Sequence, residues 1–152
     1  MEKVDETDRK ILHYLNENAK MPSKELARIL KIHPNTLLQR IKKLEKNKVI
    51  KKYKSVINYE KTGIEMMALI FIKVRMKPDW EKTLRPLANI PQINSFLLIT
   101  GTADAVITVR VKNKDDLTMV VREIQKNEVV SKTMTYLVLD HYKLPEDYNP
   151  FQ

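Results

Sequence analysis

A short stretch near residue 40 carries side chains that can bind nucleic acid. Asn35, Gln39 and Arg40 have the amide and guanidinium groups that pair with base edges in the major groove of DNA. From Arg40 to Lys54 the sequence holds eight basic residues and a single acid. Lysines mostly contact phosphates, which position a protein on DNA without reading its sequence. The alternative interpretation is a solvated surface helix whose lysines serve solubility.

Catalytic or metal-binding patterns are not found in the sequence. The three histidines, at positions 13, 33 and 141, lie far apart and share no metal-ligand spacing. The chain has no cysteine, which excludes disulfide scaffolds, thiolate metal sites and a cysteine nucleophile. Its two glycines are too few for a glycine-rich phosphate loop. We therefore expect a protein that is not an enzyme and that uses no metal or cofactor.

Composition places the chain among globular proteins. It has 152 residues, of which 43% are hydrophobic and 31% charged. The longest apolar run, Met66–Ile72, is seven residues, against about twenty for a membrane helix. The first residues do not resemble a signal peptide, so a cytoplasmic location without membrane association is expected.

The positive charge is concentrated in the first part of the chain. Residues 1–60 hold 15 Lys/Arg and 8 Asp/Glu, a net charge of +7, whereas residues 61–152 hold 13 and 11, a net charge of +2. An excess of this kind in one part favours a polyanionic partner, with nucleic acid ahead of a membrane surface.

Three short helices must position the candidate DNA-binding side chains. Apolar residues at helical spacing predict a first helix through Leu15, with Asp5 as its N-cap, and a second helix around residues 26–30. Pro34 suits the first position of a third helix, whose apolar stripe includes Leu37 and Leu44. A short strand or wing is expected over residues 49–58. The pattern is that of a winged helix-turn-helix.

The remainder of the chain changes to strand periodicity. Strands are expected over 66–76, 93–100, 105–112 and 133–141. Helices are expected over 79–88, capped by Asp79, and over 113–126, capped by Asn113. This βαββαβ order predicts a ferredoxin-like sandwich with both helices on one face of an antiparallel sheet, and hence an α+β protein. Residues 145–152 are expected to be a poorly ordered tail unless a partner holds them.

The motifs of both parts resemble the Lrp/AsnC family of prokaryotic transcription regulators, archaeal members included. The resemblance rests on Val4-Asp5-x-x-Asp8-x-x-Ile11-Leu12-x-x-Leu15, Glu25-Leu26-Ala27, Pro34-x-Thr36 and Arg40-Ile41-x-x-Leu44-Glu45, and it covers almost the whole chain. It implies that the third helix reads DNA, that dimers form through the second-domain sheets, and that four dimers can assemble further.

Three positions depart from the family pattern. His33 replaces the serine that usually caps the recognition helix, and an imidazole can also accept a helix N–H group. Lys31 and Lys48 replace glycines, so a left-handed backbone there would cost about 1 kcal/mol.

The resemblance also implies an amino-acid effector site in the second domain. Gly101 and Asp104 match a Gly-x-x-Asp motif between two strands, in which the aspartate would hold the ligand's ammonium group. The many threonines suit a neutral polar side chain such as that of glutamine, although threonine is also simply a good strand former. The candidate effector-binding residues are Thr100, Gly101, Thr102, Ala103, Asp104, Thr133, Thr135 and Tyr136.

The sequence thus predicts a DNA-binding transcription regulator that responds to a free amino acid and self-associates as a homodimer and a tetramer of dimers. Its expected parts are a helix-turn-helix domain over 1–50, a wing and linker over 51–63, an effector and oligomerisation domain over 64–145, and a tail over 146–152. Two alternatives remain, an ACT-like metabolite-binding subunit and an architectural DNA-binding protein. The candidate DNA-binding residues are Ser23, His33, Asn35, Thr36, Gln39, Arg40, Lys42, Lys43, Lys51 and Lys52.

Overall fold

The computed structural model describes residues 4–151 and divides them into two compact units. The first unit comprises residues up to Val56 together with residues from Tyr142 onward, and the second is Ile57–His141. Residues 1–3, where the absence of a signal peptide was predicted, and residue 152 of the predicted tail lie outside the described residues.

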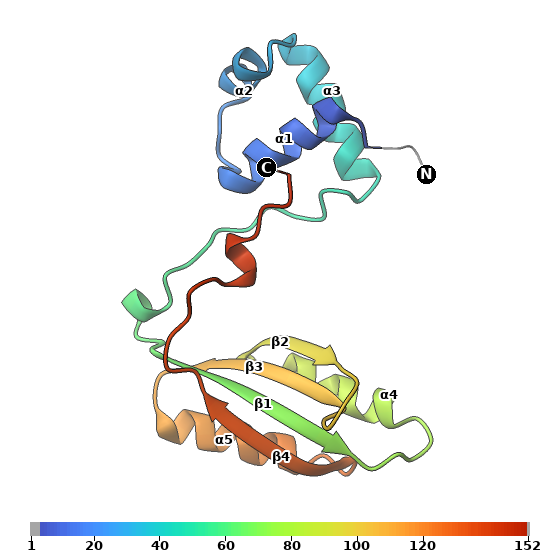
Figure 1. The fold of residues 1–152 in the computed structure, drawn as a ribbon, viewed down its shortest axis with the longest axis vertical. Helices are drawn as coiled ribbons and strands as arrows, with labels where there is room; N and C mark the ends of the chain where they lie inside the picture. The colour runs from blue at the N-terminus through green and yellow to red at the C-terminus, as the bar shows by residue number, and fades with distance from the viewer. Residues whose placement is uncertain (1–3, 152) are drawn as a thin grey trace. The chain divides into compact units, whose positions relative to one another are not determined.

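Three helices form the first unit: α1 (Glu6–Glu17), α2 (Ser23–Leu30) and α3 (Pro34–Lys46) (Figure 1). Ile11, Leu26, Leu37 and Leu44 are buried together between them. The predicted N-cap of α1 is confirmed, because Asp5 accepts a hydrogen bond from the Asp8 N–H, and the Asp8 side chain accepts one from Asp5. This reciprocal capping satisfies two of the N–H groups that a helix start leaves without partners.

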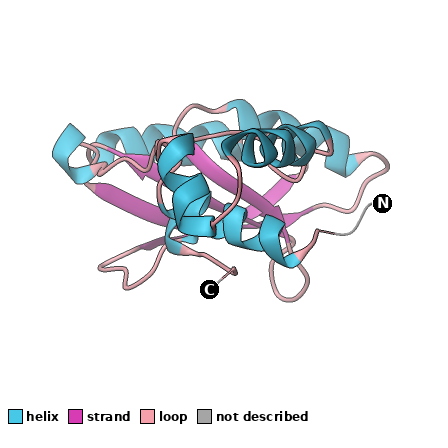
Figure 2. Cartoon of the chain, turned by 90° about the horizontal axis from the view of Figure 1, so that it is seen from above, coloured by secondary structure: helices cyan, strands magenta, loops and turns pink. Residues whose placement is uncertain are grey.

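The predicted wing strand is not formed. Residues 51–58 are exposed and belong to no strand, and every strand of the described chain lies between Met66 and Leu137. Figure 2 colours the strands magenta and the loops pink. An isolated extended segment has no neighbour with which to exchange backbone hydrogen bonds. The Tyr53 hydroxyl instead donates to Glu45 Oε1 on α3 at 2.9 Å.

The second unit is a four-stranded antiparallel sheet in the order β2-β3-β1-β4. Its strands are β1 (Met66–Val74), β2 (Ile93–Leu98), β3 (Ala105–Val111) and β4 (Val130–Leu137). Helix α4 (Trp80–Leu84), continued by a 3-10 segment η2 (Arg85–Asn89), and helix α5 (Lys114–Gln125) pack on one face. This order confirms the predicted ferredoxin-like topology.

Strand periodicity decides which face of the sheet is covered. Alternate residues of β1 and β3, among them Ile70 and Ile107, are fully buried with Leu84 of α4 and Ile124 of α5. The residues between them point to the other face, which carries no helix and is only partly buried. One apolar face is therefore packed within the unit, and the opposite face is open.

Several predicted boundaries were wrong for tertiary reasons. Strand β4 was expected at 133–141 but spans Val130–Leu137, because it can continue only where β1 pairs with it. The expected strands 66–76 and 93–100 end two residues early, at Val74 and Leu98.

Asp79 precedes α4, but its backbone is left-handed and its side chain does not cap the helix. Its carboxylate pairs with Lys82 at 2.7 Å. The cap at Asn113 is confirmed.

The predicted tail is packed against α1 in the first unit. Asn149 is buried, and its amide Nδ2 lies 3.0 Å from His13 Nδ1 and 2.6 Å from Glu17 Oε1. Asn16 donates to the Tyr148 carbonyl, and Phe151 packs against the helical core. The tail was expected to be poorly ordered unless a partner holds it, and α1 supplies polar partners and an apolar surface for it.

Candidate functional site

Helix α3 is held by contacts that leave its N-terminal half accessible. His33 is its N-cap, with Nδ1 accepting a hydrogen bond from the Asn35 N–H at 3.2 Å, and Pro34 occupies the first turn. The imidazole therefore caps the helix in the way expected of a serine hydroxyl. Lys31 between α2 and α3 and Lys48 after α3 have φ values of 54° and 56°, so both departures from glycine lie in the left-handed region.

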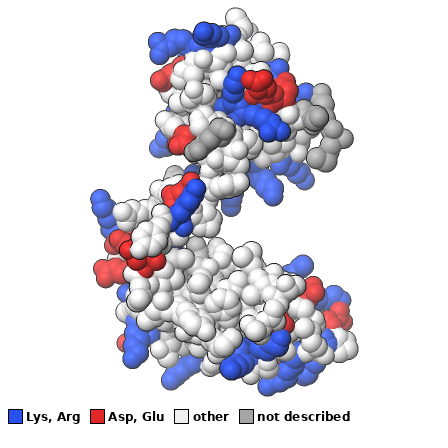
Figure 3. All heavy atoms as spheres, in the orientation of Figure 1, with Lys and Arg blue, Asp and Glu red and all other residues white. Residues whose placement is uncertain are grey.

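The exposed face of α3 carries most of the candidate DNA-binding residues. Asn35, Thr36, Gln39, Lys42 and Lys43 are all exposed, on the side of the helix opposite the buried Leu37 and Leu44. Lys51 and Lys52 are exposed in the segment that follows α3, and Ser23 is half-buried at the start of α2. Figure 3 shows lysine and arginine side chains gathered on parts of this unit. The arrangement presents amide and hydroxyl groups at one end of a helix, with cations beyond them.

Arg40 differs from the other candidate residues because two carboxylates already bind it. Its Nη1 lies 2.7 Å from Asp5 Oδ2 and 2.8 Å from Asp8 Oδ1, and Asp8 is buried. The Asp5 and Asp8 carboxylates raise the pKa of Arg40. The pKa of Asp5 is lowered, mainly by the hydrogen bond from the Asp8 N–H and next by the hydrogen bond from Arg40. The side chain expected to read bases thus ties α3 to the capping box of α1, a contact between distant residues that helix periodicity cannot reveal.

The predicted effector turn is organised around Asp104, whose carboxylate is also engaged. Oδ2 accepts a hydrogen bond from the Val74 N–H at 2.8 Å, and Oδ1 lies 3.0 Å from Lys73 Nζ. The pKa of Asp104 is lowered, mainly by the hydrogen bond from the Val74 N–H and next by the hydrogen bond from Lys73. The lowered pKa keeps the carboxylate ionised. Gly101 has φ 120°, as a tight turn requires, and Ala103 is buried. Sequence reasoning missed Lys73, whose only signal was its position on the polar side of β1.

The other predicted effector residues do not converge on one point of the protomer. Thr133 pairs with Ile72 at the end of the sheet near the turn, but its hydroxyl accepts a hydrogen bond from Gln125 of α5. Thr135 pairs with the helix-facing Ile70, whereas Tyr136 pairs with Leu69 and points to the open face. Successive residues of a strand alternate between faces, so Tyr136 cannot share a pocket with the two threonines in one protomer.

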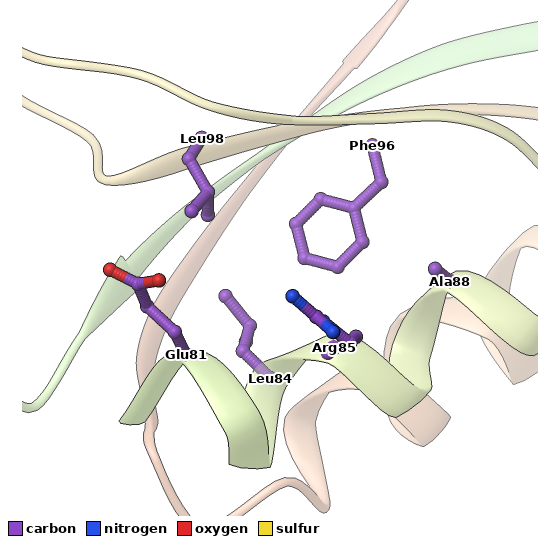
Figure 4. A pocket seen from close by; sticks show the side chains of 6 residues that line it. All are labelled: Glu81, Leu84, Arg85, Ala88, Phe96 and Leu98. Atoms are coloured by element: carbon purple, nitrogen blue, oxygen red, sulfur yellow. The ribbon is translucent and has the colours of Figure 1, made fainter. Parts of the chain in front are cut away.

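A small pocket lies between α4, η2 and β2. Its volume is about 210 Å³, and a wider hollow next to it reaches Thr100 and Asp104 of the turn. Figure 4 shows the side chains that line the pocket: Glu81, Leu84, Arg85, Ala88, Phe96 and Leu98. No motif in the sequence marks these residues, because no local pattern links a helix to the strand that packs over it.

Metal and membrane sites find no support in the described residues. Within residues 4–151, no group of three or more histidine or acidic side chains could hold a metal ion. In the same range no helix is long and apolar enough to cross a membrane.

Comparison with known proteins assigns both units. Residues 4–45 match the AsnC-type helix-turn-helix domain, and residues 68–147 match the Lrp/AsnC ligand binding domain. The chain is 32% identical over 140 residues to the HTH-type transcriptional regulator FL11 of Pyrococcus furiosus, covering 92% of each chain.

Solved structures share the fold. A transcriptional regulator from Neisseria meningitidis in complex with L-methionine superposes with a TM-score of 0.89 at 23% identity, covering 93% of this chain and 94% of that one. A feast or famine regulatory protein from Mycobacterium tuberculosis, also complexed with L-methionine, gives 0.88 at 23% identity, covering 97% and 100%.

Proposed function

Because the chain belongs to the Lrp/AsnC family of transcriptional regulators, we propose that it binds specific DNA sequences and that a free amino acid controls its binding or assembly. The observation that supports this most directly is the exposed N-terminal face of α3. There, Asn35, Thr36 and Gln39 stand together on a helix whose other side is buried. A helix of this kind fits the major groove, which is about 12 Å wide.

Each DNA-binding residue receives a role from its position. Asn35 and Gln39 pair with base edges, and Thr36 contacts a base or a phosphate. Lys42, Lys43, Lys51 and Lys52 contact phosphates, as does Ser23 at the start of α2. His33 sets the start of α3 through its capping bond, and Arg40 holds α3 against α1 and does not touch DNA.

The open face of the sheet supports self-association. Leu97 and Tyr136 are 57% and 56% exposed there, and Leu69, Phe71 and Val106 of the same face are only partly buried. Figure 3 shows a surface of largely uncharged atoms on the second unit. Covering this face with a second copy would remove apolar area from water, so we propose a homodimer and a tetramer of dimers. A dimer places two recognition helices on half-sites one helical turn, or a multiple of it, apart.

The effector is proposed to be a neutral amino acid bound near residues 100–104. The two structural relatives are complexes with L-methionine, and the threonines of this chain would also accommodate glutamine. Thr133, Thr135 and Tyr136 take part only if the site is completed by another protomer, since one protomer does not bring them together. A regulator of transcription works where the DNA is, so a cytoplasmic location is proposed as well.

Selection of DNA from a random library tests the DNA-binding proposal. A sequence-specific regulator enriches one motif, whereas an architectural protein enriches none, and an ACT-like subunit retains no DNA. Gln39→Ala should relax the motif at one position, at a cost of about 1–3 kcal/mol. Lys51→Ala should weaken binding to all sequences and reduce the salt slope by about one. Lys114→Ala, a matched exposed lysine at the start of α5, should change neither.

A further inference from the structure

Helix α3 carries one apolar side chain on its exposed surface, that of Leu38. The exposed fraction of Leu38 is 42%, whereas Leu37 is fully buried and Ile41 packs against the core of the first unit. A single exposed leucine is ordinary on a protein surface, so the chemistry open to it depends on its neighbours. The other exposed residues of this helix, all within the described range, are polar or charged: Asn35, Thr36, Gln39, Lys42, Lys43, Glu45 and Lys46.

Leu38 shares one flank of α3 with two candidate DNA-binding residues. Asn35 precedes it by three positions and Lys42 follows it by four. Side chains at these spacings are neighbours on a helix, with about 5–6 Å between their Cβ atoms. Arg40 lies on the other flank, where two carboxylates at the start of α1 hold its guanidinium group. Leu38 therefore lies between an amide that can pair with adenine and a cation that can contact a phosphate.

An apolar side chain in the major groove can recognise one group, the methyl group of thymine. The edges of cytosine, adenine and guanine carry hydrogen-bonding groups and no methyl group. A leucine placed against those polar groups would remove them from water without replacing their hydrogen bonds. Against a thymine methyl group, the same leucine removes apolar area of both partners from water. A leucine in this position therefore discriminates in favour of thymine.

We propose that Leu38 contacts a thymine methyl group and makes that base part of the recognised DNA sequence, an inference that rests on the proposed sequence-specific DNA binding. Three residues of an α-helix advance by about 4.5 Å, and one base pair of DNA rises by about 3.4 Å. A helix lying along the groove thus brings Leu38 to the base pair next to the one that Asn35 contacts. The recognised motif then holds a thymine beside the adenine that Asn35 reads.

Replacement of single thymines by deoxyuridine tests this contact, because uracil differs from thymine only in lacking the methyl group. The full-length protein is bound to the motif selected from the random library, and fluorescence anisotropy gives its affinity with each thymine replaced in turn. At one thymine, uracil should weaken binding about fourfold, the loss expected for one buried methyl group. Leu38→Ala should bind the thymine and uracil forms of that site equally. Leu38→Met, which keeps a large apolar side chain, should retain the preference for thymine.

Two matched variants control for effects other than the contact. Ile29→Ala removes an aliphatic side chain of the same size and of similar exposure, 38%, from α2, and should leave the fourfold preference unchanged. Thr36→Ser removes a methyl group from α3 and keeps the hydroxyl. It should also leave the preference at this thymine unchanged, because residues two positions apart on a helix do not face each other.

The outcomes separate this inference from the proposed function. If every thymine-to-uracil effect is the same in Leu38→Ala as in the unaltered protein, or if the selected motif holds no thymine, the inference is overturned and sequence-specific binding stands. A changed oligomeric state of Leu38→Ala in light scattering, with an unchanged thymine preference, would overturn it in favour of a contact between copies of the chain. Enrichment of no motif would overturn the proposed function and this inference together.

Discussion

Replacing Asn149 by aspartate should loosen α1 more than replacing it by alanine. The Asn149 amide Nδ2 donates to the His13 carbonyl at 3.3 Å and to Glu17 Oε1 at 2.6 Å, and it lies 3.0 Å from His13 Nδ1. Its Oδ1 accepts from the Phe151 N–H at 3.2 Å, so the contacts on both ends fix the amide orientation. An aspartate has the same shape but presents an oxygen to the His13 carbonyl and to Glu17 Oε1, the two groups that the amide donates to.

The expected magnitude follows from these contacts. Alanine removes the side-chain donor and leaves the Phe151 N–H without its acceptor, a cost of about 2 kcal/mol for a buried group. Aspartate restores that acceptor but places a carboxylate against Glu17, for a total of about 3 kcal/mol. At 1.36 kcal/mol per factor of ten, these costs correspond to about 30-fold and more than 100-fold changes in the opening equilibrium of α1.

Amide hydrogen exchange read by mass spectrometry measures this opening in peptides from α1. Asn94→Ala, a matched change at an exposed residue of β2, should leave exchange in α1 unchanged. Trp80, the single tryptophan, lies in the second unit, so its fluorescence confirms that the sheet is intact in every variant. Unchanged exchange in Asn149→Asp would refute the packing of the tail on α1, and equal effects of the two variants would refute the hydrogen-bond account.

Three further predictions concern the ion pairs and the left-handed residues. Arg40→Met should lower the melting temperature of the first unit, because it leaves the buried Asp8 carboxylate without its cation. If Arg40 reads DNA instead, the variant will keep its stability and lose one position of the selected motif. Asp104→Asn should destabilise the second unit at neutral pH and flatten its acid unfolding curve, followed by Trp80 fluorescence. The pKa of Asp104 is lowered in the folded state, so its contribution is complete above the ordinary carboxyl range and is lost as pH falls through the lowered pKa; an unchanged acid limb would contradict this. Lys31→Gly should raise the unfolding free energy by about 0.5–1 kcal/mol in urea titrations, since glycine adopts φ 54° without strain, and a decrease would show that the lysine is favoured there.

Local spacing was enough to predict most of the helices and strands and the exposed residues of the candidate interface. The N-cap at Asp5, the start of α3 at Pro34 and the cap at Asn113 depend on residues within four positions of one another. Helical periodicity identified the buried stripe of α3, and the residues outside that stripe, including Asn35 and Gln39, were therefore predicted to be exposed. Such features follow from the sequence because helix geometry alone brings these residues together.

Tertiary structure decided what no local pattern contains. Arg40, which the sequence predicts to read bases, also pairs with Asp5 and Asp8, more than thirty positions away at the start of α1. Lys73 and Val74 engage Asp104 across the sheet, and the tail meets α1 through contacts that span more than 130 positions. The sequence by itself determined most of the helices and strands and which faces they bury, but not their exact ends or the absence of a wing strand. Which charges are neutralised, and which remain for DNA or a ligand, depended on segments that only the folded chain brings within hydrogen-bond distance.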